Sequence, residues 1–211
     1  MSAASVRHPI FARVFDRFCG ALEKEIGPHR DELLARLGGR VVELGAGNGI
    51  NFGHYPGTVD EVVAIEPEPY LQTKARAAAA SAPIDVTVLD GTADALPLPD
   101  DAADVAVTCL VLCTVPDQAR ALAELRRVLK PGGELRFLEH VRSQRPRLAR
   151  VQRRLDSSGI WPRLGGGCHC ARDTAAAIAA AGFEIERVRS FDVGPSWGHT
   201  SPHVLGAARA Q

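Results

Sequence analysis

The 211-residue sequence lacks any long apolar run. No segment approaches the roughly 18 uninterrupted apolar residues that a membrane-spanning helix needs. Charged residues between Arg7 and Arg17 interrupt the region where a signal peptide would carry its apolar core. We therefore expect a soluble, intracellular protein with no stable membrane insertion.

The sequence also lacks net charge, because 25 Lys and Arg residues balance 25 Asp and Glu residues. Proteins that bind the backbone of DNA or RNA generally present a basic surface, so the balance argues against nucleic acid as a partner. One local run, 142–154, holds six arginines and no acidic residue. We interpret that run as a solvated helix face rather than a binding patch.

Cysteines are few and scattered. The five of them form no disulfide framework, which indicates a reducing cytoplasm. Cys168 and Cys170 flank His169, but zinc ligands typically come as C-x-x-C with a second pair elsewhere, so we expect no metal site. Cys109 and Cys113 are expected to pack in the core, because a free cysteine behaves as a small hydrophobe.

The pattern along the chain predicts a single α/β domain with helices on both faces of a mostly parallel sheet, because strand-like and helix-like segments alternate. Two helices, 9–22 and 29–37, are expected before the alternation begins. Residues 160–170 read as a loop and 194–199 as an insert between the last two strands. The expected strands are 40–45, 61–66, 84–89, 103–109, 133–139, 183–192 and 203–209, and the further expected helices are 48–54, 68–80, 117–129, 147–157 and 174–181.

The most informative segment is 41–49, in which a buried-strand pattern breaks into a turn with glycines at 45, 47 and 49. The next strand-like run, 61–66, ends at Glu66. Glycines let the backbone approach a ligand closely and adopt positive φ, and a carboxylate so placed can accept both hydroxyls of a ribose. The segment predicts a nucleotide pocket, although the spacing alone does not separate dinucleotide from S-adenosylmethionine binding.

With Glu43 two residues before the first glycine, the turn reads E-x-G-x-G-x-G. This form resembles motif I of the class I S-adenosylmethionine-dependent methyltransferases. The segments 90–97, 104–112 and 125–135 follow in the order and at the separations typical of that family. The resemblance implies a Rossmann-like sheet with a C-terminal antiparallel strand, and S-adenosyl-L-methionine as cofactor.

Four further segments are similar to the small-molecule thiol S-methyltransferases: 110–115, 138–141, 166–174 and 202–206. That resemblance implies methylation of a thiol on a small apolar metabolite or natural product. The alternative is a C- or N-methyltransferase acting on a quinone precursor or a phospholipid head group. A non-catalytic cofactor-binding module and a nicotinamide oxidoreductase are the rivals from other classes.

The resemblance also assigns site residues. Glu43 is expected near the amino end of the cofactor's methionine, and Glu66 on its ribose. Many relatives have Asp where Thr92 stands, so the Thr92 hydroxyl or the Ala93 backbone would contact the adenine. The full set of expected cofactor-binding residues is Glu43, Gly45, Ala46, Gly47, Asn48, Glu66, Pro67, Thr92, Ala93 and Leu110.

On the acceptor side, the candidate catalytic residues are His140, His169 and Asp173. His140 ends a predicted strand at the cofactor's edge of the sheet, and its pKa near neutrality suits proton transfer from a thiol. A purely structural histidine is the alternative. Residues 1–37 are interpreted as a helical lid on the 38–211 domain, with the oligomeric state left open between monomer and homodimer. The candidate acceptor-binding side chains are Phe11, Phe15, Phe18, Tyr55 and Trp161.

Overall fold

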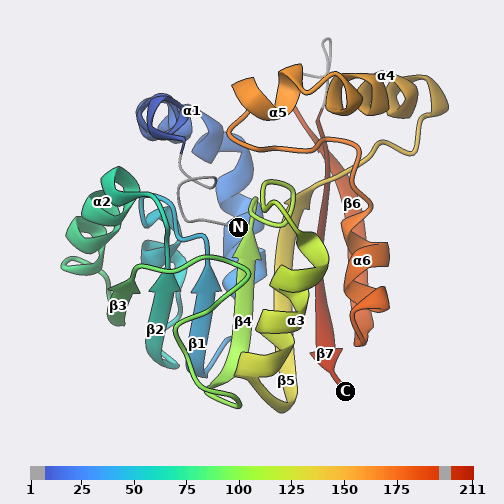
Figure 1. Cartoon of the computed structure of the whole chain (residues 1–211). Helices are drawn as coiled ribbons and strands as arrows, with labels where there is room; N and C mark the ends of the chain where they lie inside the picture. The colour runs from blue at the N-terminus through green and yellow to red at the C-terminus, as the bar shows by residue number, and fades with distance from the viewer. Residues whose placement is uncertain (1–7, 195–200) are drawn as a thin grey trace.

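A seven-stranded sheet forms the centre of the molecule in the computed structural model, which describes residues 8–194 and 201–211 (Figure 1). The strand order is β3-β2-β1-β4-β5-β7-β6. All neighbouring strands pair in parallel except β7, which is antiparallel to both β5 and β6. The strands are β1 (Gly39–Leu44), β2 (Val59–Ile65), β3 (Asp85–Leu89), β4 (Ala103–Cys109), β5 (Leu129–His140), β6 (Phe183–Val193) and β7 (Ser201–Ala210).

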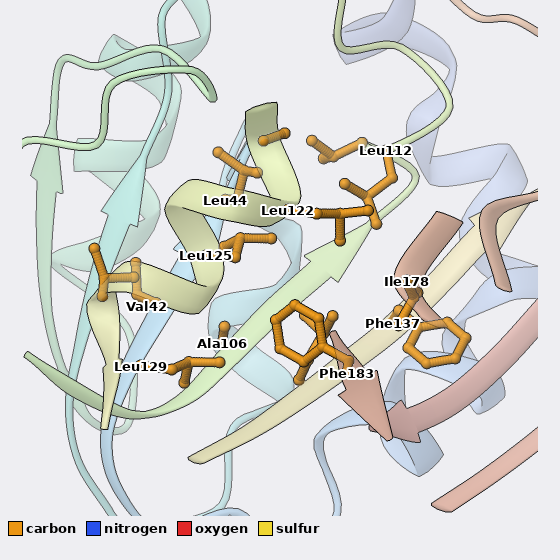
Figure 2. Packing of buried hydrophobic residues seen from close by; sticks show 14 of the residues in the cluster. Val42, Leu44, Ala106, Leu112, Leu122, Leu125, Leu129, Phe137, Ile178 and Phe183 are labelled. Carbon is orange, nitrogen blue, oxygen red and sulfur yellow. The ribbon is translucent and has the colours of Figure 1, made fainter. Parts of the chain in front are cut away.

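Helices cover both faces of the sheet because alternate side chains of each strand point to opposite faces. On one face, α3 (Gln118–Val128) and α6 (Thr174–Ala180) pack on a cluster that includes Val42, Ala106 and Phe137 (Figure 2). On the other face, α1 (Pro9–Leu34) and α2 (Pro69–Ala79) pack on a cluster that includes Val41, Val62 and Val107. This arrangement confirms the predicted fold class.

The strand order places a ligand site at the middle of the sheet. The chain runs outward from β1 through β2 to β3, then crosses back so that β4 pairs with the other side of β1. The loops after β1 and β4 therefore leave the sheet in opposite directions at neighbouring carboxyl ends. Open α/β sheets bind ligands at this switch point.

One predicted boundary is wrong: the two expected helices, 9–22 and 29–37, form the single helix α1, with Pro28 inside it. An interior proline costs about 3 kcal/mol because it removes a backbone hydrogen bond. Burial of Ile26, Leu33 and Leu34 against the sheet offsets that cost, since each fully buried side chain contributes roughly 1.5–3 kcal/mol.

Smaller differences concern two of the short helices. The predicted loop 160–170 begins with a short helix, α5 (Ile160–Leu164), and the predicted helix 48–54 is the 3-10 helix η2 (Ile50–His54). The helix α4 spans Pro146–Ser157, as expected. Most of the predicted insert at 194–199 lies outside the described residues. Within the described ranges, the structure holds no helix with both the length and the apolar character needed to cross a membrane.

Candidate active site

The glycine turn after β1 forms the floor of the site. Gly45, Gly47 and Gly49 have φ of 69°, 58° and 82°, a left-handed conformation that glycine adopts without a steric penalty. A Cβ added at Gly45 would lie 2.4 Å from Cγ2 of Val111, so a side chain there would collide with the segment after β4. The turn is held to β2 because the backbone N–H groups of Gly45 and Ala46 both donate to the Ile65 carbonyl oxygen.

Glu66 follows β2 directly and faces this turn. Its Oε2 accepts the Gly47 N–H at 2.8 Å, and its Oε1 accepts the Glu68 N–H at 3.0 Å. The side chain is 5% exposed, and burial is the main cause that raises the pKa of its carboxyl above the usual value. Each carboxylate oxygen keeps a second lone pair, so Glu66 can still accept from a ligand hydroxyl.

Glu43 lies behind the turn in a buried polar network. Its carboxylate accepts from Asn51 Nδ2 at 2.7 Å and from the Tyr55 hydroxyl at 2.8 Å. Arg30 Nη1 donates to Asn51 Oδ1 at 2.6 Å, which extends the network to α1. Burial raises the pKa of Glu43 to about 7, against the lowering by its two hydrogen-bond donors.

A cavity of about 390 Å³ opens at the carboxyl ends of β1, β2 and β4. Twelve of the residues predicted for the site line it: Gly45, Ala46, Gly47, Asn48, Glu66, Pro67, Thr92, Ala93, Leu110, Phe11, Phe15 and His140. The volume falls within the range of about 300–1,000 Å³ that small-molecule sites occupy. The side chain of Phe18 lies outside the described part of the chain.

Five other predicted residues do not line this cavity. Glu43 and Tyr55 lie in the network behind the glycine turn. His169 lies in the loop after α5, where its backbone N–H donates to the Cys113 carbonyl oxygen at 2.8 Å. Asp173 caps α6 and pairs with Arg142 at 2.8 Å. Trp161 is 40% exposed, and its ring lies against Gly165.

Asp94 is a cavity residue that the sequence analysis missed. Interaction with the Thr92 side chain is the main cause that lowers the pKa of the Asp94 carboxyl. Both residues line the cavity beyond Glu66, at the turn after β3. A carboxylate is therefore present at this end of the cavity, two residues after the position where the family pattern places one.

The opposite end of the cavity carries two thiols and two imidazoles: Cys113, Cys168, His140 and His203. His140 Nδ1 lies 3.4 Å from Cys168 Sγ, and the centroids of the two imidazole rings are 5.4 Å apart. Burial lowers the pKa of His203 to about 4, so this ring is neutral at pH 7. Its Nδ1 lies 2.8 Å from the Ser201 carbonyl oxygen, to which it donates as the N–H tautomer.

Comparison with known proteins identifies the family. A methyltransferase domain model matches residues 42–137. The chain is 34% identical to thiol S-methyltransferase TMT1B of Rattus norvegicus over 171 residues. This aligned region covers 80% of this chain and 69% of the relative. The chain belongs to the class I S-adenosylmethionine-dependent methyltransferases.

Two further similarities agree with this membership. The methyltransferase superposes on an S-adenosylmethionine-dependent methyltransferase of Thermotoga maritima with a TM-score of 0.65 and 25% identity, covering 94% of this chain and 99% of the other. It is also 32% identical over 136 residues to the ubiquinone/menaquinone biosynthesis C-methyltransferase UbiE of Shewanella sp., which covers 62% of this chain and 54% of the relative.

The residues of the methyltransferase fit S-adenosylmethionine, its cofactor. Gly45 and Gly47 both line the cavity, and at Gly47 the absence of a side chain leaves backbone that a ligand can approach closely. The Glu66 carboxylate stands in the wall beside them and keeps acceptor capacity for a sugar. The cavity continues past this position toward both Asp94 and His140.

Missed residues share a cause: the sequence signals for them are weak. Arg30 reaches the cavity from the second half of α1, a helix whose continuity across Pro28 was not predicted. Asn51 has no motif of its own and is recognisable only through its bond to Glu43. Cys113, which is expected in the core, is buried but also lines the cavity, and only the fold brings it to the same cavity as Cys168, 55 positions further along the chain.

Proposed function

We propose that this methyltransferase methylates the thiol of a small, rather apolar acceptor. The observation that carries the proposal is the likeness to thiol S-methyltransferases over 80% of the chain, together with a cavity whose far end combines apolar walls with His140. Phe11 of α1 lies against Gly166 at that end, and Phe15 lies over Gly47 of the glycine turn. Their rings are 6.1 Å apart and lie close to parallel.

The cofactor contacts follow from the positions of the lining residues. Gly45, Ala46, Gly47 and Asn48 would surround the methionine end, and Glu66 and Pro67 the ribose. Thr92 and Ala93, with Asp94, would hold the adenine, and Leu110 would pack beside it. Glu43 would act from behind the wall, by fixing Asn51, rather than by touching the cofactor.

The chain itself has limited chemistry to perform. When bound, S-adenosylmethionine supplies a methyl group already activated by the positive charge on its sulfur. The protein must align the acceptor, exclude water and remove one proton. A thiol with a pKa of about 8.5 is only a few per cent thiolate at pH 7, and His140 is the lining group suited to take that proton.

His169 and Asp173 keep supporting places in this proposal. His169 ties the loop after α5 to Cys113 through its backbone, and Asp173 anchors the start of α6. Trp161 would shape the acceptor end through Gly165, which lines the cavity and lies against the Trp161 ring. Tyr55 supports Glu43 from the buried network.

Acceptor competition tests the proposal. The purified chain is incubated with methyl-labelled S-adenosylmethionine and a panel of small alkyl and aryl thiols, prenylated phenols and the S-methylated form of each thiol. We expect label in the extracted thiol products and none from the S-methylated controls, which have no proton to lose. Label on the phenol ring with none on any thiol would replace the proposal with the C-methylation that UbiE's name describes.

A further inference from the structure

Two cysteines meet at the acceptor end of the cavity. Cys113 follows β4 and Cys168 follows α5, and both line the cavity. Their segments are tied together because the His169 N–H donates to the Cys113 carbonyl oxygen at 2.8 Å. Both side chains therefore face the same cavity from adjoining segments, and both cysteines are free thiols.

Cys168 lies beside a histidine ring at this end of the cavity. His140 Nδ1 is 3.4 Å from Cys168 Sγ, within hydrogen-bonding distance of the sulfur. Interaction with the neighbouring Cys113 and His140 lowers the pKa of Cys168, whereas interaction with Cys168 and burial raise the pKa of Cys113. The two shifts favour a thiolate at Cys168 and a protonated thiol at Cys113.

Cys170 shows that a lowered pKa is not common to every thiol of this loop. It lies two residues from Cys168 but is buried beside Asp156, whose Oδ1 is 3.2 Å from its Sγ. Burial and this carboxylate raise the pKa of Cys170 to about 12. Arg172, in contrast, lies near both Cys113 and Cys168 and adds positive charge to their surroundings.

We propose that Cys168 and Cys113 are a thiol–disulfide exchange pair that opens a disulfide form of the acceptor inside the cavity. A thiolate backed by a neighbouring second thiol is the arrangement that such exchange requires. The role of the pair in supplying a free thiol for methylation rests on the proposed function. The exchange chemistry itself does not depend on methyl transfer.

The step balances without an outside oxidant, because the acceptor disulfide is itself reduced. The Cys168 thiolate attacks one sulfur of R–S–S–R′, which forms Cys168–S–S–R and releases R′–S⁻. Cys113 then attacks Cys168 Sγ, which forms the Cys113–Cys168 disulfide, and its proton leaves with the second thiol, R–SH. A low-molecular-weight thiol would reduce the protein disulfide and restore the pair.

The test uses 2,2′-dipyridyl disulfide, which releases a coloured thione at each exchange, on the reduced full chain without cofactor. At pH 5 we expect Cys168 to react at least about tenfold faster than free glutathione, because a larger thiolate fraction outweighs its weaker nucleophilicity. The wild-type chain should release two thiones in this fast phase. Peptide mass spectrometry should then find the Cys113–Cys168 disulfide.

Three variants make the outcome decisive. Cys113→Ser should release one fast thione and retain a mixed disulfide on Cys168, whereas Cys168→Ser should lose the fast phase. Cys170→Ser is the matched control from the same loop and should behave as wild type. Thermal melting of each variant checks that it is folded. A fast phase that survives in folded Cys168→Ser, or a wild-type reaction that stops at one thione, would overturn the proposal.

The exchange pair and the thiol methyltransferase activity can fail separately. Two fast thiones with no methylation of any reduced thiol would leave the exchange pair standing and remove its acceptor role. Methylation of reduced thiols with no fast phase would contradict the exchange proposal and leave the proposed thiol methyltransferase activity unaffected.

Discussion

The Glu66 carboxylate accepts the backbone N–H of Gly47 at 2.8 Å, which ties the end of β2 to the glycine turn after β1. One side chain therefore shapes the turn and also stands in the cavity wall. The two tasks are compatible because a carboxylate oxygen can accept more than one hydrogen bond. Loss of the Glu66 side chain should therefore disturb both the conformation of the turn and the binding of the ligand.

Replacement of Glu66 by Gln tests the ribose contact. The amide places a donor where Gly47 and Glu68 already donate, and it removes the charge that strengthens bonds from ribose hydroxyls. We expect affinity for S-adenosylhomocysteine to fall about tenfold, which is about 1.4 kcal/mol. Calorimetric titration measures this affinity, with Glu61→Gln in β2 as the control. Unchanged affinity would remove Glu66 from the site.

Gly45→Ala should destabilise the fold. The left-handed backbone at φ 69° costs a non-glycine residue about 1–2 kcal/mol, and the new Cβ would meet Val111. We expect the free energy of unfolding to drop by about 2 kcal/mol or more in urea denaturation. Gly53→Ala is the matched control because an added Cβ there has no neighbour within 4 Å. Equal losses in the two variants would contradict the steric explanation.

Glu43 should make stability depend on pH with a defined sign. Its pKa rises from the ordinary value of 4.5 to about 7 in the folded chain. Between these values the folded state holds a proton that the unfolded state has lost, so raising the pH lowers the free energy of unfolding. The free energy of unfolding of the wild type minus that of Glu43→Gln should therefore fall by up to about 3 kcal/mol as the pH rises from 4.5 to about 7. A difference that is flat or rises with pH would contradict this assignment.

The sequence predicted the parts of the molecule that rest on local pattern. The strands of the parallel sheet follow from buried apolar runs such as 61–66, and the glycine turn follows from its spacing. Continuity of α1 through Pro28 could not be predicted, because it depends on burial of Ile26 and Leu33 against a sheet formed later in the chain. Tertiary packing there outweighs the local proline signal.

The site likewise combines residues that a local sequence motif predicts with residues that only the fold brings together. Glu66 and Gly47 belong to a local motif, and the structure places both at the cavity. The acceptor end is assembled from segments far apart in sequence, so the proximity of Cys168 to His140 has no sequence signature. Asp173, a candidate catalytic residue in the sequence, caps the start of α6 and pairs with Arg142.

His140→Ala should lower turnover while leaving affinity for S-adenosylhomocysteine nearly intact. General-base catalysis typically contributes about 10²–10⁴-fold, and the loss should be greater for alkyl thiols than for the more acidic aryl thiols, which ionise without help. Steady-state rates over a series of thiols of increasing pKa measure this dependence. A drop in cofactor affinity with unchanged turnover would reassign His140 to cofactor support.

The central claim is that the acceptor atom is sulfur, and one molecule can test it. The chain is incubated with methyl-labelled S-adenosylmethionine and 4-mercaptophenol, which offers a thiol, a hydroxyl and ring carbons to the same cavity. Mass spectrometry and NMR of the product locate the methyl group. We predict that the label is found on sulfur; a product methylated on oxygen or on the ring, with its thiol free, would contradict the assignment.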